Sequence, residues 1–126
     1  MPRPLDPLAA RARLVRQLYA KLETQRNGRP WARAELAQGF VGDVGDLMKL
    51  MMAKDGVRRA AQLESRLRHE FGDCLGCLFV LADAYGVDLE SAFHHTMDYL
   101  ETQLKARTTP AKSRTSPKRK LRARRG

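Results

Sequence analysis

The chain has 126 residues, of which 43% are hydrophobic and 30% are charged, and this balance is typical of one globular domain and not of a disordered chain. It contains no run of about 18 apolar residues, which argues against a transmembrane helix, and its N-terminus lacks the apolar core of a secretion signal. We therefore expect a cytoplasmic protein without a membrane partner.

Positive charge is concentrated at the C-terminal end. Residues 107–126 contain nine Lys or Arg and no acid, which leaves fifteen basic and fourteen acidic residues in the rest of the chain. The same stretch has almost no apolar side chain, so it cannot bury enough surface to offset the entropy of ordering. The sequence predicts an all-α domain over 1–106 and a disordered Lys/Arg-rich tail over 107–126. The tail could bind nucleic acid non-specifically through counterion release, or be a solubilising extension.

The part before the tail predicts four helices, because apolar residues recur at spacings of three and four without the alternation of a β-strand. The predicted helices span about 8–24, 32–54, 57–85 and 88–104. Gly28, Gly56 and Gly86 stand where the first three helices are expected to end. Asp88 is a good N-cap for the fourth. The predicted fold is an all-α bundle of four helices.

Apolar stripes on these helices are the predicted core. On the first helix the stripe consists of Leu8, Ala12, Val15, Leu18, Tyr19 and Leu22, and on the third it consists of Leu63, Leu67, Phe71, Cys74, Leu75, Leu78 and Leu81. The second helix also contains Gly39, Gly42 and Gly45, each of which weakens a helix by about 1 kcal/mol relative to Ala. We interpret these glycines as places where another backbone or a ligand comes close.

Two acidic pairs lie inside the apolar parts of the second and third helices. Asp43 and Asp46 are three residues apart, and so are Glu70 and Asp73, so each pair points to one side of its helix. A carboxylate beside a core is costly unless it is paired or bound to a cation. Four oxygen ligands suit Mg²⁺ or Mn²⁺, not zinc. On spacing alone, ordinary surface residues of amphipathic helices are the more common explanation.

Three stretches give these acids a wider context: ELAQGFVGDVGDL over 35–47, HEFGDCL over 69–75 and LADAYGVDLESAF over 81–93. In this order and spacing they resemble the MazG-like nucleotide pyrophosphohydrolases, a branch of the all-α NTP pyrophosphatase superfamily. Members of that family usually show E-E-x-x-E on one helix and E-x-x-D on the next. The resemblance implies a four-helix MazG-like bundle and a homo-oligomer.

The resemblance also implies roles for individual residues. Glu70 and Asp73 match the second motif without change and are expected to be catalytic metal ligands, with Asp43 and Asp46 completing the metal site. Gly42 stands where the first Glu of the first motif is expected, and Asp is one methylene shorter than Glu. The implied reaction is the Mg²⁺-dependent hydrolysis of a nucleoside triphosphate to a monophosphate and pyrophosphate, with Mn²⁺ as the alternative ion.

The altered first motif keeps a second hypothesis open. The chain could be a catalytically weakened or inactive MazG-like protein that acts as an interaction module through its basic tail. Residues 93–99 also lack the basic and Asn residues with which family members often contact the nucleotide, so we assign no substrate-binding residue there.

Cys74, Cys77 and Trp31 each allow two interpretations. The two cysteines could contribute to a zinc site with a histidine, but buried structural thiols are the simpler interpretation. Trp31 could stack on a base, although anchoring of its loop is the simpler role.

Overall fold

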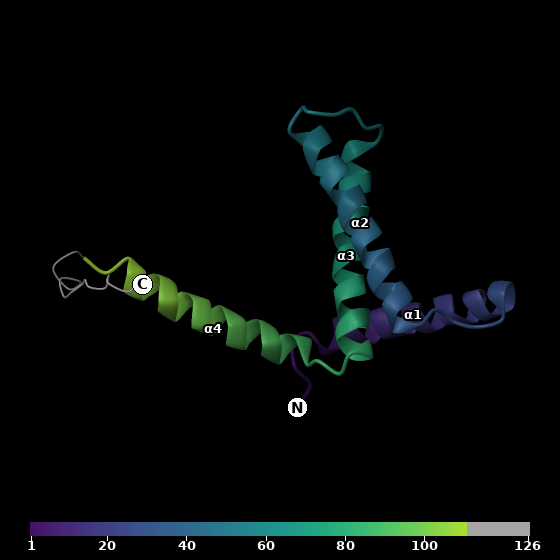
Figure 1. Cartoon of the computed structure of the whole chain (residues 1–126), viewed down its shortest axis with the longest axis horizontal. Helices are drawn as coiled ribbons and strands as arrows, with labels where there is room; N and C mark the ends of the chain where they lie inside the picture. Colours follow the sequence, from purple (N-terminus) through teal and green to yellow (C-terminus); the bar gives the residue numbers. More distant parts are fainter. Residues whose placement is uncertain (111–126) are drawn as a thin grey trace, which may run out of the picture. The chain divides into compact units, whose positions relative to one another are not determined.

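The structure is a computed structural model of the chain, and it describes residues 1–110. The described residues form four α-helices and no β-strand, and the helices are α1 (Asp6–Asn27), α2 (Arg33–Lys54), α3 (Leu63–Ala84) and α4 (Leu89–Arg107) (Figure 1). The prediction of an all-α chain with four helices is confirmed. Residues 111–126, which make up most of the predicted basic tail, lie outside the described residues. The predicted binding of nucleic acid by this tail therefore stays a prediction.

The chain divides into two compact units, Met1–Leu89 and Glu90–Gly126. The first contains α1, α2 and α3, and α4 belongs to the second. The predicted domain boundary between residues 106 and 107 stays a prediction. No described helix combines the length and the apolar character needed to cross a membrane.

Local sequence signals account for the helix ends. Gly28 and Gly56 have φ values of 83° and 84°, the left-handed conformation that glycine adopts without strain. The Gly28 N–H donates to the Thr24 carbonyl over 2.9 Å, which closes α1. At the start of α2, the Glu35 carboxylate accepts a hydrogen bond of 2.8 Å from the Ala32 N–H, as the second half of a capping box does.

The third helix begins later than its sequence pattern predicts. α3 starts at Leu63, where we expected a start near Val57, and Gln62 before it has a positive φ of 53°. The reason is a reversal of chain direction: the side chains of Lys54 at the end of α2 and Glu64 at the start of α3 form an ion pair. The residues between them must make the turn, so they are not available to the helix.

α2 and α3 form an antiparallel pair, side by side (Figure 1). Asp43 near the middle of α2 contacts Cys77, and Arg33 at the start of α2 contacts Ala84 at the end of α3. Residue numbers that rise along one helix therefore meet numbers that fall along the other. The buried side chains of the described residues all come from this pair: Leu47, Leu50, Cys74 and Phe79.

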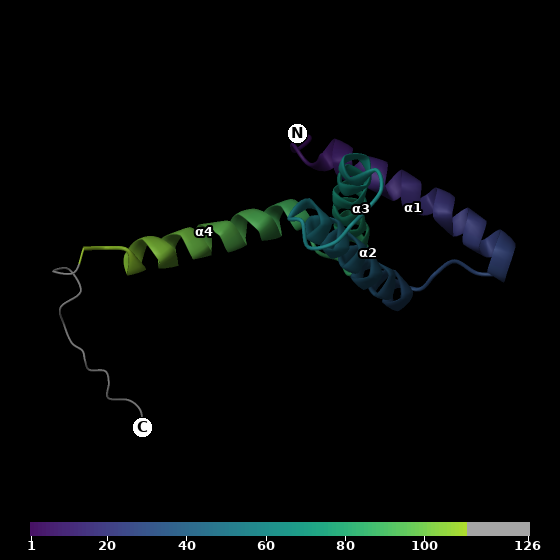
Figure 2. The same ribbon diagram turned by 90° about the horizontal axis from the view of Figure 1, so that it is seen from above.

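α1 packs against α3, and Figure 2 shows it running past that helix. The Arg13 guanidinium lies 3.6 Å from the Asp83 carboxylate on α3. On α1 itself, Arg16 donates two hydrogen bonds of 2.6 and 2.9 Å to Glu23, and Glu23 also accepts 2.7 Å from the Trp31 N–H. Glu23 thus ties the loop after α1 back to α1, and the bonds from Arg16 hold the pKa of its carboxyl below the usual range.

Much of the predicted core is exposed. On α1, Leu8, Val15, Leu18, Tyr19 and Leu22 keep between 37% and 57% of their surface accessible, and no residue of α1 is buried. On α3, Phe71, Leu75 and Leu78 are 53%, 48% and 41% exposed, whereas Phe79, which we did not place in the core, is buried. The prediction that these exposed residues belong to the chain's own core is therefore wrong, whereas Cys74 of the same α3 stripe is buried as predicted. The contact between α2 and α3 buries only one side of each helix. The neighbouring side of α3, which carries Phe71, Leu75 and Leu78, remains exposed to solvent.

Replacing Glu23 with Gln should lower the free energy of unfolding by about 1–3 kcal/mol, because charge-assisted hydrogen bonds at a poorly exposed site are lost. The side chains of Arg16 and Glu23 are only 18% and 12% exposed. Chemical denaturation followed by circular dichroism measures the change. The matched control is Glu64→Gln, whose ion pair with Lys54 is 54% and 65% exposed and should contribute less than about 0.5 kcal/mol. Equal effects of the two substitutions would contradict the conclusion that the hydrogen bonds of Glu23 stabilise the fold by holding the loop after α1.

Candidate metal centre

The two acidic pairs face each other across α2 and α3. Because the helices are antiparallel, Asp46 lies opposite Glu70 and Asp43 lies opposite Asp73. Carboxylate oxygens of Asp43, Asp46 and Glu70 all lie within 4.8 Å of one another, and so do ligand atoms of Asp43, Asp73 and Cys77. These groups of neighbouring ligand atoms overlap and together contain all four predicted acids, which we call the acidic cluster. Their role as metal ligands stays a prediction.

Burial and the charges of neighbouring acids disfavour the anionic forms of Glu70 and Asp73. Burial, followed by the charge of Asp73, raises the pKa of Glu70. Burial, followed by the charge of Asp43, raises the pKa of Asp73. In addition, Oε1 of Glu70 is out of contact with solvent and has no hydrogen-bond partner among the described residues. A buried carboxylate oxygen without a donor is costly, and a bound cation would remove that cost.

Cys77 adds a thiol at the edge of the acidic cluster. Its Sγ donates a hydrogen bond of 3.2 Å to Oδ2 of Asp43, and burial, helped by this bond, raises the pKa of the thiol to about 12. In this structure the thiol acts as a hydrogen-bond donor to the carboxylate of Asp43. Cys74 is buried, as the structural interpretation of these cysteines predicted. Because most of the neighbouring donors are carboxylates, the donor set fits an ion that prefers oxygen, such as Mg²⁺ or Mn²⁺.

His69 also belongs to this region, and we gave it no role from the sequence. One of its ring nitrogens lies within 4.8 Å of ligand atoms of Glu70 and Asp73, and its positive charge would lower the pKa of both carboxyls. The sequence could have indicated that His69 lies near the acids, because His69 and Asp73 are four residues apart and share a helix face.

The three glycines of α2 differ from one another in their surroundings. A Cβ at Gly39 would lie 3.2 Å from Cζ3 of Trp31, so the close approach expected there comes from the indole ring. Gly42 and Gly45 have nothing within 4 Å of the same position. The expected close neighbour is therefore absent at these two sites among the described residues, and Gly42, one turn before Asp46, has room for a side chain.

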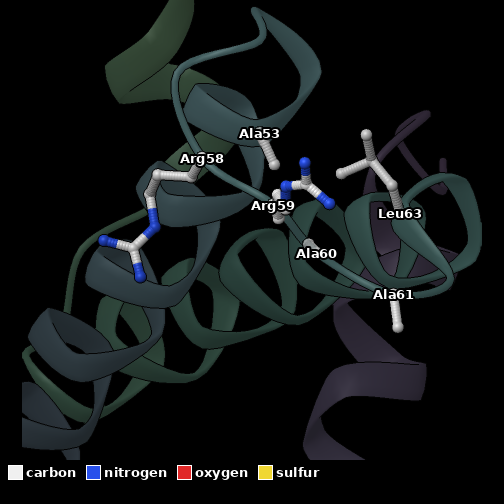
Figure 3. A pocket seen from close by; sticks show the side chains of 6 residues that line it. All are labelled: Ala53, Arg58, Arg59, Ala60, Ala61 and Leu63. Carbon is white, nitrogen blue, oxygen red and sulfur yellow. The ribbon is translucent and has the colours of Figure 1, made fainter.

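A hollow of about 500 Å³, apart from the acidic cluster, lies at the loop between α2 and α3. It is lined by Ala53, Arg58, Arg59, Ala60, Ala61 and Leu63. Figure 3 shows that the guanidinium groups of Arg58 and Arg59 point away from each other. No acid lines this hollow, and its cations do not converge, so it offers no catalytic group.

The acidic cluster predicts an unusual pH dependence for the metal-free chain. The pKa values of Glu70 and Asp73 are higher in the folded than in the unfolded state, so the folded state binds more protons between the two values. The contribution of these two carboxyls to the free energy of unfolding should therefore fall as the pH rises above about 4.5. Replacing Glu70 with Gln should reduce this fall and, in EDTA at pH 7, raise the free energy of unfolding by about 1 kcal/mol. Denaturation at a series of pH values tests this, and a Glu70→Gln variant less stable than the wild type in EDTA would contradict it.

Comparison of the chain with protein-family models, with curated proteins and with solved structures found no match in any of the three.

Proposed function

We propose that this protein is a MazG-like nucleoside triphosphate pyrophosphohydrolase that depends on Mg²⁺, or on Mn²⁺ in its place. One observation carries the proposal: four carboxylates, two from α2 and two from α3, belong to overlapping groups of neighbouring ligand atoms, and Oε1 of Glu70 is buried there without a partner among the described residues. The identity of the family rests on the motifs in residues 35–47, 69–75 and 81–93.

The residues of the acidic cluster have two proposed roles, metal binding and proton transfer. Asp43, Asp46, Glu70 and Asp73 would hold the ion, which when bound supplies positive charge to the phosphate oxygens. Glu70 would accept a proton from water, and the direction of its pKa shift, which makes the carboxylate more basic, favours this role. Water then adds across the anhydride bond between the α- and β-phosphates, and the products are a nucleoside monophosphate and pyrophosphate. The proton taken from water passes through the carboxylate to solvent.

The decisive assay measures pyrophosphate release from canonical and modified nucleoside triphosphates in the presence of Mg²⁺ or Mn²⁺. Replacing Glu70 with Gln should lower the rate at least about a hundredfold, because it removes a ligand and a proton acceptor together. The control Glu64→Gln, on the same helix but in an exposed ion pair, should retain the wild-type rate. No turnover of any nucleotide by the folded wild type would overturn the enzyme proposal and leave the inactive, MazG-like interaction module as the alternative.

A substitution at Gly42 allows a complementary test, in which metal binding is expected to become tighter. A Glu at this position would restore the first acid of the family motif, and a Cβ built at Gly42 has no neighbouring atom within 4 Å. We expect Gly42→Glu to bind Mg²⁺ at least about tenfold more tightly in a calorimetric titration. The matched control is Gly45→Glu, which is equally unobstructed but lies off the motif position. An identical gain in both variants would mean that added charge alone is responsible.

The exposed apolar surface supports a homo-oligomer as the working form. Phe71, Leu75 and Leu78 form a stripe on α3, spaced four and three residues apart, and each is at least 41% exposed. α2 adds a second stripe, formed by Val41, Val44, Met48 and Met51. Contiguous apolar surface of this kind on a small chain is typical of an interface between subunits. We propose that a second copy of the chain covers it.

Sedimentation equilibrium tests this assembly. The wild type should sediment as a dimer or larger, and Phe71→Lys should weaken the association at least about tenfold, because burial of one Phe contributes about 1.5–3 kcal/mol. Val57→Lys, at a loop residue that is 68% exposed, is the matched control and should associate like the wild type. A wild type that stays monomeric at high concentration would refute the oligomer.

A further inference from the structure

A pocket of about 250 Å³ lies between α1, the N-terminal end of α2 and the C-terminal end of α3. It is separate from the acidic cluster. Leu36 in its wall is seven residues from Asp43 on α2, and Val80 is seven residues from Asp73 on α3. At 1.5 Å per residue, the pocket is therefore about 10 Å from the acids along both helices.

One wall of this pocket is the side chain of Trp31, which is held from two sides. Its ring lies over Gly39, where a Cβ would come within 3.2 Å of Cζ3, and its backbone N–H donates to Glu23. Trp31 nevertheless remains 44% exposed. A large aromatic face that is held in place and still partly open is suited to contact with a planar ring. Leu36, Phe79 and Val80 add apolar surface to the pocket.

The same pocket carries more positive than negative charge. Arg13, Arg16 and Arg33 line it, and Asp83 is the one acid among its lining residues. Arg16 is engaged by Glu23. Nε of Arg13 lies 3.6 Å from the Asp83 carboxylate, and within the described residues the terminal nitrogens of Arg13 donate no hydrogen bond.

Arg33 is held in place and still has donors to offer. Its guanidinium carbon lies 4.4 Å from the centre of the Tyr85 ring, and its Nη1 makes one long contact of 3.4 Å with the Ala84 carbonyl. Stacking on a ring keeps a guanidinium plane oriented while its edge can bind an oxyanion. Arg13 and Arg33 can therefore offer charged donors to a ligand that lies against Trp31.

We infer that this pocket binds a small aromatic ligand that carries an oxyanion, either phosphate or carboxylate. The volume of about 250 Å³ equals that of roughly eight water molecules, at about 30 Å³ each, which is room for one ring and one charged group. The ring packs between Trp31 and the apolar residues, and the oxyanion is bound by Arg13 and Arg33. This binding needs no metal and does not depend on the proposed hydrolase activity.

Fluorescence of the full-length chain tests the inference directly, because Trp31 is its single tryptophan. The chain is titrated in EDTA with phenyl phosphate, benzoate, phenol and inorganic phosphate. Without a divalent ion, the acidic cluster repels the anions. Phenyl phosphate or benzoate should give a saturable change in emission, and the tighter of the two identifies the preferred oxyanion. Phenol and inorganic phosphate should bind at least about tenfold more weakly. Phenol binding as tightly as phenyl phosphate, or no saturable change with either aromatic anion, would overturn the inference.

Variants locate the site. The double substitution Arg13→Gln and Arg33→Gln should weaken phenyl phosphate binding at least about tenfold. Arg11→Gln, on the same helix but outside the pocket lining, should bind like the wild type. Thermal melts by circular dichroism establish that each variant is folded. If the double variant unfolds, Arg33→Lys replaces it, and because Lys lacks the planar donors of Arg, it should weaken binding severalfold. Unchanged affinity in the folded double variant, or in Arg33→Lys, would refute the assignment of the pocket.

Discussion

The antiparallel contact between α2 and α3 is the constraint on which the rest of the molecule depends. All buried side chains of the described residues belong to these two helices, and the register between the helices decides that the two acidic pairs meet. If α3 slid by one turn, about 5.4 Å, Glu70 would no longer lie opposite Asp46. The hydrogen bond from Cys77 to Asp43 and the contact from Arg33 to Ala84 mark this register at two levels. The main consequence of the small core is therefore that it fixes the register between α2 and α3.

This arrangement concentrates unfavourable electrostatics where function is proposed. Burial and mutual repulsion raise the pKa values of Glu70 and Asp73, and one Glu70 oxygen has no donor. A chain that buries so little apolar surface has few interactions to offset this cost. A cation that neutralises the acidic cluster would thus stabilise the α2–α3 contact at the same time as it prepares the cluster for chemistry, so binding and stability are coupled.

Charge changes sign along the α2–α3 pair. Acids gather in its middle, whereas arginines gather about 10 Å away, where α1 crosses, with Trp31 beside them. The bridge from Arg16 through Glu23 to the Trp31 N–H gives that end its order, since α1 itself buries no residue. The exposed apolar stripes of α2 and α3 form a further surface, which is the one proposed to bind a second copy of the chain. Acidic cluster, pocket and stripes occupy different parts of one small scaffold and can be altered separately.

The sequence by itself determined the helices, because their periodicity and their glycine stops at Gly28 and Gly56 are local signals that need no partner. It also determined that Asp43 pairs with Asp46, and Glu70 with Asp73, because residues three apart on a helix must share a side. It misjudged the start of α3, since a turn between antiparallel helices has to take its residues from one of them. Only the tertiary structure decided that the two pairs meet, that Trp31 covers Gly39, and that Phe71 lies outside the core. Each of these depends on how one helix is placed against another, and spacing along a single helix carries no information about that placement.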